Sequence, residues 1–170
     1  MPPSGARGVF RRLSEGYSRL LSALLSLSVA ILVVPVTLQI VSRYTDLIPS
    51  WIWTEEMARF FLIWMIMIGS MVGVREGMHF TVDLWPALTG RRRAAFDVFA
   101  GCFVLLFAFV FVWWGWEFTE FAWFRISELA ELPLWLIHMA WPITGVTWLI
   151  FAGERMADSL RILTRQERDA

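Results

Sequence analysis

A cluster of ionisable side chains, Glu55, Glu56 and Arg59, is the first candidate for chemistry in this chain. Two neighbouring carboxylates could act as a general acid and base. Catalysis usually needs several titratable groups that converge on one pocket, and no further acid, base or nucleophile is expected nearby. Glu55 and Arg59 are four residues apart, a spacing that lets two side chains pair on a helix. The cluster therefore indicates either an exposed ion pair or a polar contact with another membrane protein.

A second cluster contains Arg75, His79 and Asp83, again spaced by four residues. On a continued helix these side chains would form one polar stripe. The stripe is explained either by a solvated helix end or by a contact with a partner subunit on the cytoplasmic side.

Cofactor and redox chemistry have little support in the sequence. Histidines 79 and 138 could supply the two axial ligands of a haem, but we expect them near opposite faces of the membrane, about 20 Å or more apart at the helical rise per residue. Cys102 is the only cysteine, which excludes disulfides and CxxC chemistry within one chain. The sequence predicts no catalytic, substrate-binding or metal-binding residue and no cofactor, so we do not expect an enzyme.

The elements that carry these residues are four long apolar runs, in a chain that is 58% hydrophobic. They cover residues 20–41, 57–74, 94–116 and 134–153. Each is about as long as a helix that crosses the hydrocarbon core of a bilayer, and helices satisfy their own backbone groups there. We therefore predict a single all-α integral-membrane domain over residues 1–170 with four transmembrane helices. The first run lacks a small-x-small cleavage site, which favours an uncleaved helix over a signal peptide.

The arginines predict the orientation. Twelve of the 15 basic residues fall into three groups: Arg7, Arg11, Arg12 and Arg19; Arg75, Arg91, Arg92 and Arg93; and Arg155, Arg161, Arg165 and Arg168. Short cytoplasmic loops retain positive charge, so both termini are expected in the cytoplasm, with the polar residues 1–19 on the membrane surface before the first helix. The arginines thus have a topological explanation, and the net charge of zero argues against nucleic acid as a partner.

The connection between the first two spans is aromatic, with Tyr44, Trp51 and Trp53 around Pro49. Tryptophan and tyrosine favour the headgroup region, so we expect a short interfacial segment here. Thr54 is a plausible N-cap for the second helix.

Small residues recur at helical spacing in three of the runs. They are Ser22, Ser26 and Ala30; Gly69, Gly73 and Gly77; and Gly101, Ala108 and Gly115. Such rows let helices approach closely in a membrane. We expect the glycine row of the second run to bring that helix close to a neighbour, in this chain or in a partner.

Ionisable groups are absent from the middle of every run, whereas transporters with their own ion path usually keep one there. This absence favours an accessory subunit. Three alternatives stay open: a small transporter or channel that works as a homo-oligomer, the membrane anchor of a redox enzyme, and an assembly protein unrelated to transport.

One ordered set of residues resembles a known family when read together. The set is Arg43, Trp53, Glu55, Glu56, Arg59, Trp64, Gly69, Arg75, Gly77, His79 and Asp83. This pattern, with the four-span layout, resembles the small membrane subunit (DctQ-type) of tripartite ATP-independent periplasmic (TRAP) transporters. The specific motif covers residues 43–83, and the later spans add topology only.

The resemblance implies a partnership in a bacterial inner membrane. A large multi-span permease subunit would hold the substrate and sodium sites, and a periplasmic binding protein would deliver an organic acid. This chain would be a scaffold that neither binds substrate nor catalyses. The motif residues together with Gly73 are then candidates for the partner interface. The Glu55–Glu56–Arg59 cluster would shape its outer end, while Arg75, His79 and Asp83 would order the cytoplasmic turn.

Overall fold

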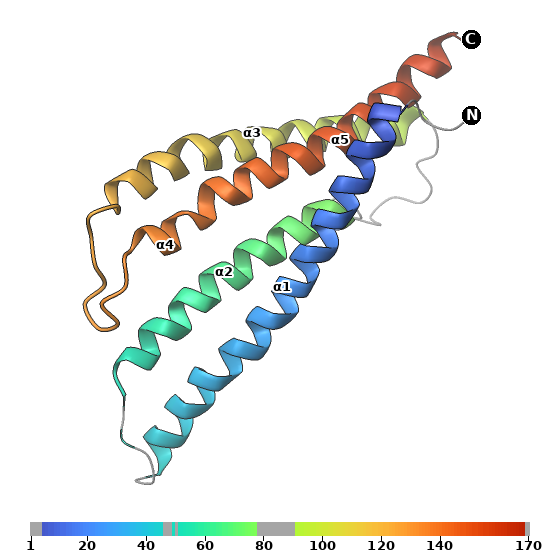
Figure 1. The fold of residues 1–170 in the computed structure, drawn as a ribbon. Coiled ribbons are helices and arrows are strands. Elements are labelled where there is room, and N and C mark those ends of the chain that lie inside the picture. The colour runs from blue at the N-terminus through green and yellow to red at the C-terminus, as the bar shows by residue number, and fades with distance from the viewer. Residues whose placement is uncertain (1–4, 46–48, 50, 78–90, 169–170) are drawn as a thin grey trace.

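The computed structural model describes residues 5–45, 49, 51–77 and 91–168. These residues form the helices α1 (Gly5–Tyr44), α2 (Trp53–Glu76), α3 (Arg91–Phe121), α4 (Trp135–His138) and α5 (Ala140–Arg168), shown in Figure 1. Four segments are long and apolar enough to cross a membrane: Gly8–Tyr44, Trp53–Glu76, Ala94–Phe121 and Trp135–Ile162. The all-helical fold with four spans is confirmed. The cytoplasmic placement of the termini stays a prediction, and the interfacial segment lies partly outside the described residues.

We had expected residues 1–19 to precede the first helix. Helix α1 instead begins at Gly5, well before its apolar run, so residues 5–19 are part of the helix. Side-chain partners explain the extension. Ser14 is buried and donates a hydrogen bond to Glu154 of α5 (2.9 Å), and the Tyr17 hydroxyl is bonded to that of Thr147 (2.8 Å). The first turns of α1 are therefore anchored on α5.

The helices form two antiparallel pairs, with α1 on α2 and α3 on α5, which meet where α2 packs on α5. In Figure 1 the pairs converge at the end that holds the start of α1 and the end of α5, and they diverge toward the other end. We call the first the terminal end and the second, where α1 meets α2 and α3 meets α4, the loop end. The order across the molecule is α1, α2, α5, α3, so α1 and α3 are edge helices.

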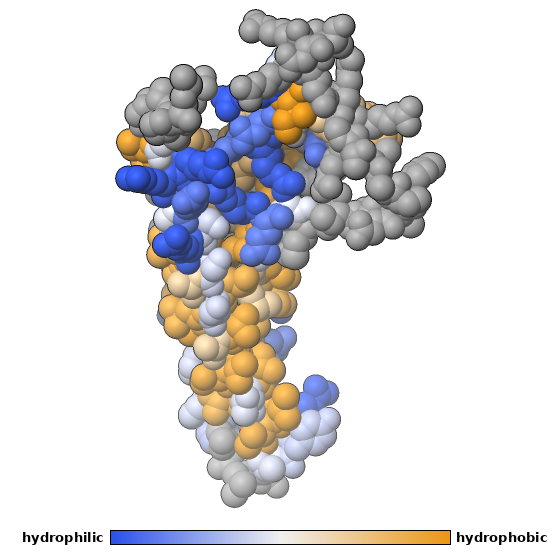
Figure 2. All heavy atoms as spheres, turned by 90° about the vertical axis from the view of Figure 1, so that its right-hand side faces the viewer, coloured by the Kyte–Doolittle hydropathy of each residue, from blue (hydrophilic) through white to orange (hydrophobic). Residues whose placement is uncertain are grey.

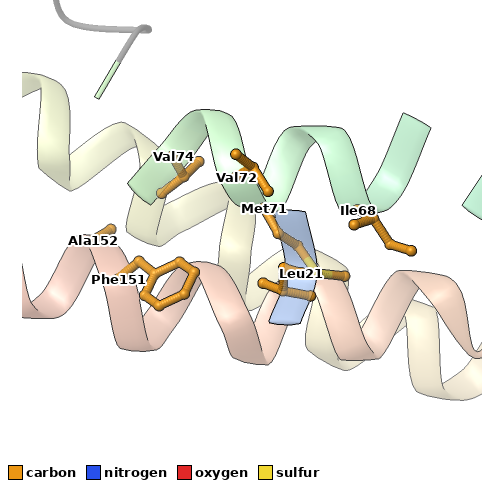
Figure 3. Packing of buried hydrophobic residues seen from close by; sticks show 7 residues of the cluster. All are labelled: Leu21, Ile68, Met71, Val72, Val74, Phe151 and Ala152. Atoms are coloured by element: carbon orange, nitrogen blue, oxygen red, sulfur yellow. The ribbon is translucent and has the colours of Figure 1, made fainter. Parts of the chain in front are cut away.

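The main core lies toward the terminal end, where three helices meet. Its buried side chains come from α1, α2 and α5: Leu21, Ile68, Met71, Val72, Val74, Phe151 and Ala152 (Figure 3). Phe151 is fully buried and Met71 is 1% exposed. The interior of this chain is thus concentrated at one end of the helices.

The α3–α5 pair depends on small residues. A Cβ added at Gly145 would lie 2.7 Å from the Val112 amide nitrogen and 2.8 Å from the Ala108 oxygen, so the backbones nearly touch. One at Gly115 would lie 2.9 Å from Trp141 Cβ, and Gly101 faces Met156. The predicted small-residue face of the third span is therefore the contact with α5. By contrast, the serine row of α1 is exposed.

A break at Met139 separates α4 from α5. Pro142 explains it, because a proline inside a helix removes one backbone donor and its ring clashes with the carbonyl four residues earlier, here that of His138. The break frees the Leu136 carbonyl, which accepts a hydrogen bond from Trp64 Nε1 of α2 at 3.0 Å. An unpaired backbone group would be costly in a membrane, so this contact supports the break.

The outer surface of the helices is largely apolar. Figure 2 shows hydrophobic side chains over most of the length, with hydrophilic ones gathered near the upper end. Within the most apolar part of each span, 6% of the α1 residues and 11% of the α3 residues are buried, against 44% in α2. The edge helices therefore lack the cover that the inner helices have.

Candidate partner interface

Glu55 and Arg59 lie on the surface of the first turns of α2. Their charged atoms are 3.7 Å apart, and the side chains are 67% and 64% exposed. The i,i+4 pairing that the sequence predicts is confirmed. Exposed pairs of this kind contribute little to stability. Because both side chains are exposed, they are accessible from outside the chain.

Glu56 lies differently from its neighbour. Its carboxylate Oε2 accepts hydrogen bonds from the backbone amides of Leu129 (3.0 Å) and Ala130 (2.6 Å), in the connection between α3 and α4. That connection is further braced by Ser127, whose amide donates to the Leu132 oxygen and whose hydroxyl accepts from the Leu132 amide. Glu56 therefore joins α2 to this loop within the chain.

The other motif residues at the loop end are on the surface. Arg43 is in the last turn of α1 and exposed, and Trp53 stacks on Trp51 with ring centroids 6.3 Å apart. Thr54 is not the N-cap that we had expected. Helix α2 starts one residue earlier, at Trp53, and the Thr54 hydroxyl donates to the Trp51 carbonyl at 2.6 Å.

The glycine row of α2 faces other parts of the same chain. A Cβ at Gly69 would be in ordinary contact with Leu25 of α1, at 3.7 Å. Gly77 ends the helix in the left-handed region (φ 73°), and its amide donates to the Gly73 oxygen. The guanidinium of Arg155 from α5 occupies the space that a Gly77 side chain would need. The close neighbours of Gly69 and Gly77 are therefore α1 and α5.

Arg75 is the centre of a polar network at the terminal end. Its guanidinium pairs with the Glu154 carboxylate and donates to the Ser14 hydroxyl at 2.9 Å, so α1, α2 and α5 share one cluster. The pair is 20% and 17% exposed, and the guanidinium also lies 5.2 Å from the centre of the Phe151 ring. Charged hydrogen bonds at such low exposure are among the stronger polar contacts in a fold.

The polar stripe that the sequence predicts extends beyond the described residues. Helix α2 ends at Glu76, and His79 and Asp83 lie outside the described residues. His138 is engaged locally: its Nδ1 is 2.7 Å from the Leu134 oxygen, and its ring stands edge-on to Phe118. In the parts of the chain that the structure describes, no group of three or more His, Cys, Asp or Glu side chains is arranged to hold a metal ion.

Sequence reasoning missed two of the most constrained positions, Glu154 and Gly145. A signal for Glu154 existed, because it is the first charged residue after the fourth apolar run, as Arg75 is after the second. In a four-span layout the second and fourth runs end on the same side of the membrane. Arg75 and Glu154 are therefore expected at the same depth, where their opposite charges can pair. A signal for Gly145 also existed, because Ala152 follows it by seven residues in the same run, the spacing that relates Gly101, Ala108 and Gly115.

Comparison with known proteins places the chain in a family. The family model described as "Tripartite ATP-independent periplasmic transporters, DctQ component" matches residues 32–162. This chain belongs to that family. Family membership and four apolar helices together make it a multi-pass protein of the inner membrane.

A curated relative of this DctQ-family chain is the C4-dicarboxylate TRAP transporter small permease protein DctQ of Rhodobacter capsulatus. The two are 28% identical over 95 residues, which cover 54% of this chain and 42% of the relative. The match thus spans less than half of the relative's length.

Proposed function

We propose that this chain is the scaffold subunit of a sodium-coupled TRAP transporter that imports an organic acid. In this proposal it packs against a large permease subunit, a periplasmic binding protein delivers the substrate, and both termini of the chain lie in the cytoplasm. The Rhodobacter relative is named as a C4-dicarboxylate transporter component, which supports a carboxylate substrate for the assembled transporter.

The open arrangement of the helices carries the proposal. In their most apolar parts the edge helices α1 and α3 have only 6% and 11% of their residues buried, so each presents a long uncovered face. Helix association in lipid depends on packing and on small residues, and α1 offers an exposed row of Ser22, Ser26 and Ala30. Such a face suits a larger membrane neighbour.

The distribution of charge supports a role without a substrate path of its own. No ionisable residue lies between Arg19 and Arg43 of α1, or between His138 and Glu154 along α4 and α5. Intramembrane ion and substrate paths usually have such groups. At the loop end, Glu55 and Arg59 remain available to orient the partner.

Affinity purification of the tagged full chain from its native membranes tests the proposal. We expect a large multi-span permease to co-purify, and less of it with the Glu55→Ala/Arg59→Ala variant. Asp158→Asn is the matched control, because it removes the exposed pair with Arg161 near the terminal end. Recovery of the chain only with copies of itself would favour the homo-oligomeric transporter or channel. Unchanged recovery of the permease with the double variant would show that these two side chains are not part of the interface.

A further inference from the structure

The first turns of α1 carry a basic surface that lies apart from the motif residues. Arg11 pairs with Glu15 (3.5 Å), whereas Arg12 and Arg19 are exposed and, within the described part of the chain, have no ion-pair partner. A spacing of seven residues puts Arg12 and Arg19 about 20° apart around the helix and about 10 Å apart along it. Two unpaired guanidinium groups therefore point in nearly the same direction.

The contacts of α1 with α5 fix that direction. Ser14 and Tyr17 are each hydrogen-bonded to a side chain of α5, and Leu21 on the same side of α1 is buried. At 3.6 residues per turn, Arg12 and Arg19 lie on the opposite side of the helix. The rotation of α1 thus holds both guanidinium groups away from the rest of the helices.

An apolar stripe runs beside these arginines along α1. Its exposed side chains are spaced by four or seven residues: Val9, Leu13, Leu20 and Leu27. Gly16 lies between the stripe and the arginines, and a Cβ added there would meet no atom within 4 Å. A charged side, an apolar side and open space between them match the headgroup and the acyl chain of a phospholipid.

The arginines lie at the depth of the headgroups. The polar network around Arg75 joins three helices at this end, and Arg19 directly precedes the apolar run that starts at Leu20. The headgroup layer adds about 5–7 Å on each side of the hydrocarbon core. Arg19 and Arg12 therefore lie near the two boundaries of this layer, where phosphate groups are within reach. A guanidinium binds phosphate through paired, charge-assisted hydrogen bonds.

We propose that the start of α1 is a binding site for an anionic phospholipid, such as phosphatidylglycerol, in the leaflet at the terminal end. The phosphate lies between Arg12 and Arg19, and one acyl chain follows the apolar stripe past Leu20 to Leu27. A zwitterionic lipid would bring its ammonium group close to two unpaired cations, whereas an anionic lipid would not, so the surface favours net negative charge. The site does not rest on the proposed transport function.

Native mass spectrometry of the full chain tests the headgroup preference. The chain is reconstituted in vesicles with equal amounts of phosphatidylglycerol, phosphatidylethanolamine and phosphatidylcholine, and the retained lipid is identified. We expect phosphatidylglycerol to be retained several-fold over the other two. The Arg12→Gln/Arg19→Gln variant should lose this preference and keep its thermal unfolding midpoint, because both side chains are exposed.

The matched control is Arg125→Gln/Arg161→Gln. It also removes two exposed arginines, but these already contact the Phe121 ring and the Asp158 carboxylate. The control should keep the preference for phosphatidylglycerol. Equal retention of the three lipids by the unmodified chain, or an equal loss of preference in both double variants, would overturn the proposal.

A second measurement separates lipid from protein as the occupant. In a Cys102→Ser background, Gly16→Cys carrying a photoreactive label is activated in native membranes, where any partner subunits are present. The label has room, because the space at Gly16 is open. An adduct with phosphatidylglycerol is expected, and a protein adduct would overturn the proposal.

Discussion

The two ends of the molecule carry the same kind of ion pair in opposite surroundings. At the terminal end, Arg75 and Glu154 are 20% and 17% exposed and join three helices with the help of Ser14. At the loop end, Arg59 and Glu55 are 64% and 67% exposed and belong to one helix. The low-exposure pair fixes how the helix pairs meet, whereas the exposed pair contributes little to the fold and is accessible from outside the chain. An arginine–glutamate motif therefore indicates function only when its surroundings are known.

The largest loss of stability is expected when the Arg75–Glu154 pair at the terminal end is removed. Glu154→Gln leaves the Arg75 guanidinium without its counter-charge at low exposure, and removing one partner of a buried pair costs about 3 kcal/mol of unfolding free energy. Thermal unfolding of the purified chain in detergent measures the loss. The charge-reversed double variant Arg75→Glu/Glu154→Arg should recover part of it. A midpoint as high as that of the unmodified chain would contradict the structural role of this network.

A somewhat smaller effect is expected at the α3–α5 crossing. Gly145→Ala places a methyl group 2.7 Å from the Val112 amide nitrogen, and overpacking of this kind costs about 1–3 kcal/mol. Gly153→Ala, on the same helix with no atom within 4 Å of the new methyl group, is the control. It should be neutral or slightly stabilising, because alanine is the better helix former. Equal stability of the two variants would show that the close contact does not exist.

At the loop end, substitutions of Glu56 and Glu55 should have different effects. Glu56 is expected to hold the loop in place, whereas Glu55 is expected to contact a partner. Glu56→Ala removes the acceptor for the amides of Leu129 and Ala130, so the connection between α3 and α4 should open. Limited tryptic cleavage after Arg125 in that connection should become several-fold faster, whereas Glu55→Ala should leave it unchanged. Equal cleavage rates in both variants would contradict the assignment of Glu56 to the loop.

The smallest effect on stability is expected for Glu55→Ala. An exposed i,i+4 pair contributes about 0.3–0.5 kcal/mol, so the unfolding midpoint should barely move. Its effect should appear instead as weaker co-purification with the permease. A large loss of stability would remove the contrast between the two ends.

Much of the fold could be predicted from apolar run length. The four spans follow from composition alone, because a segment long enough to cross a bilayer has few other options. The α3–α5 contact was partly visible in the spacing of Gly101 and Gly115, since close packing in lipid needs small residues. The early start of α1 was not predictable from polarity. It depends on the contacts of Ser14 and Tyr17 with α5, which are distant in sequence.

The candidate site was less predictable, because a motif does not reveal which way each side chain points. Glu55 and Glu56 are adjacent and chemically identical, yet one is on the surface and the other is bonded to a loop more than seventy residues away. Trp64 similarly supports the Leu136 carbonyl at a break that Pro142 creates. Five of the nine pattern residues that the structure describes thus contact other elements of the chain, and this follows only from tertiary structure: Glu56, Trp64, Gly69, Arg75 and Gly77.

Uptake by reconstituted vesicles tests the scaffold role most directly. Vesicles that contain this chain with the co-purified permease and its binding protein should accumulate the organic acid that this binding protein retains, when a sodium gradient is applied. Vesicles that contain this chain alone should accumulate none. Accumulation against a gradient by the chain alone, or full uptake when the chain is left out, would contradict the account.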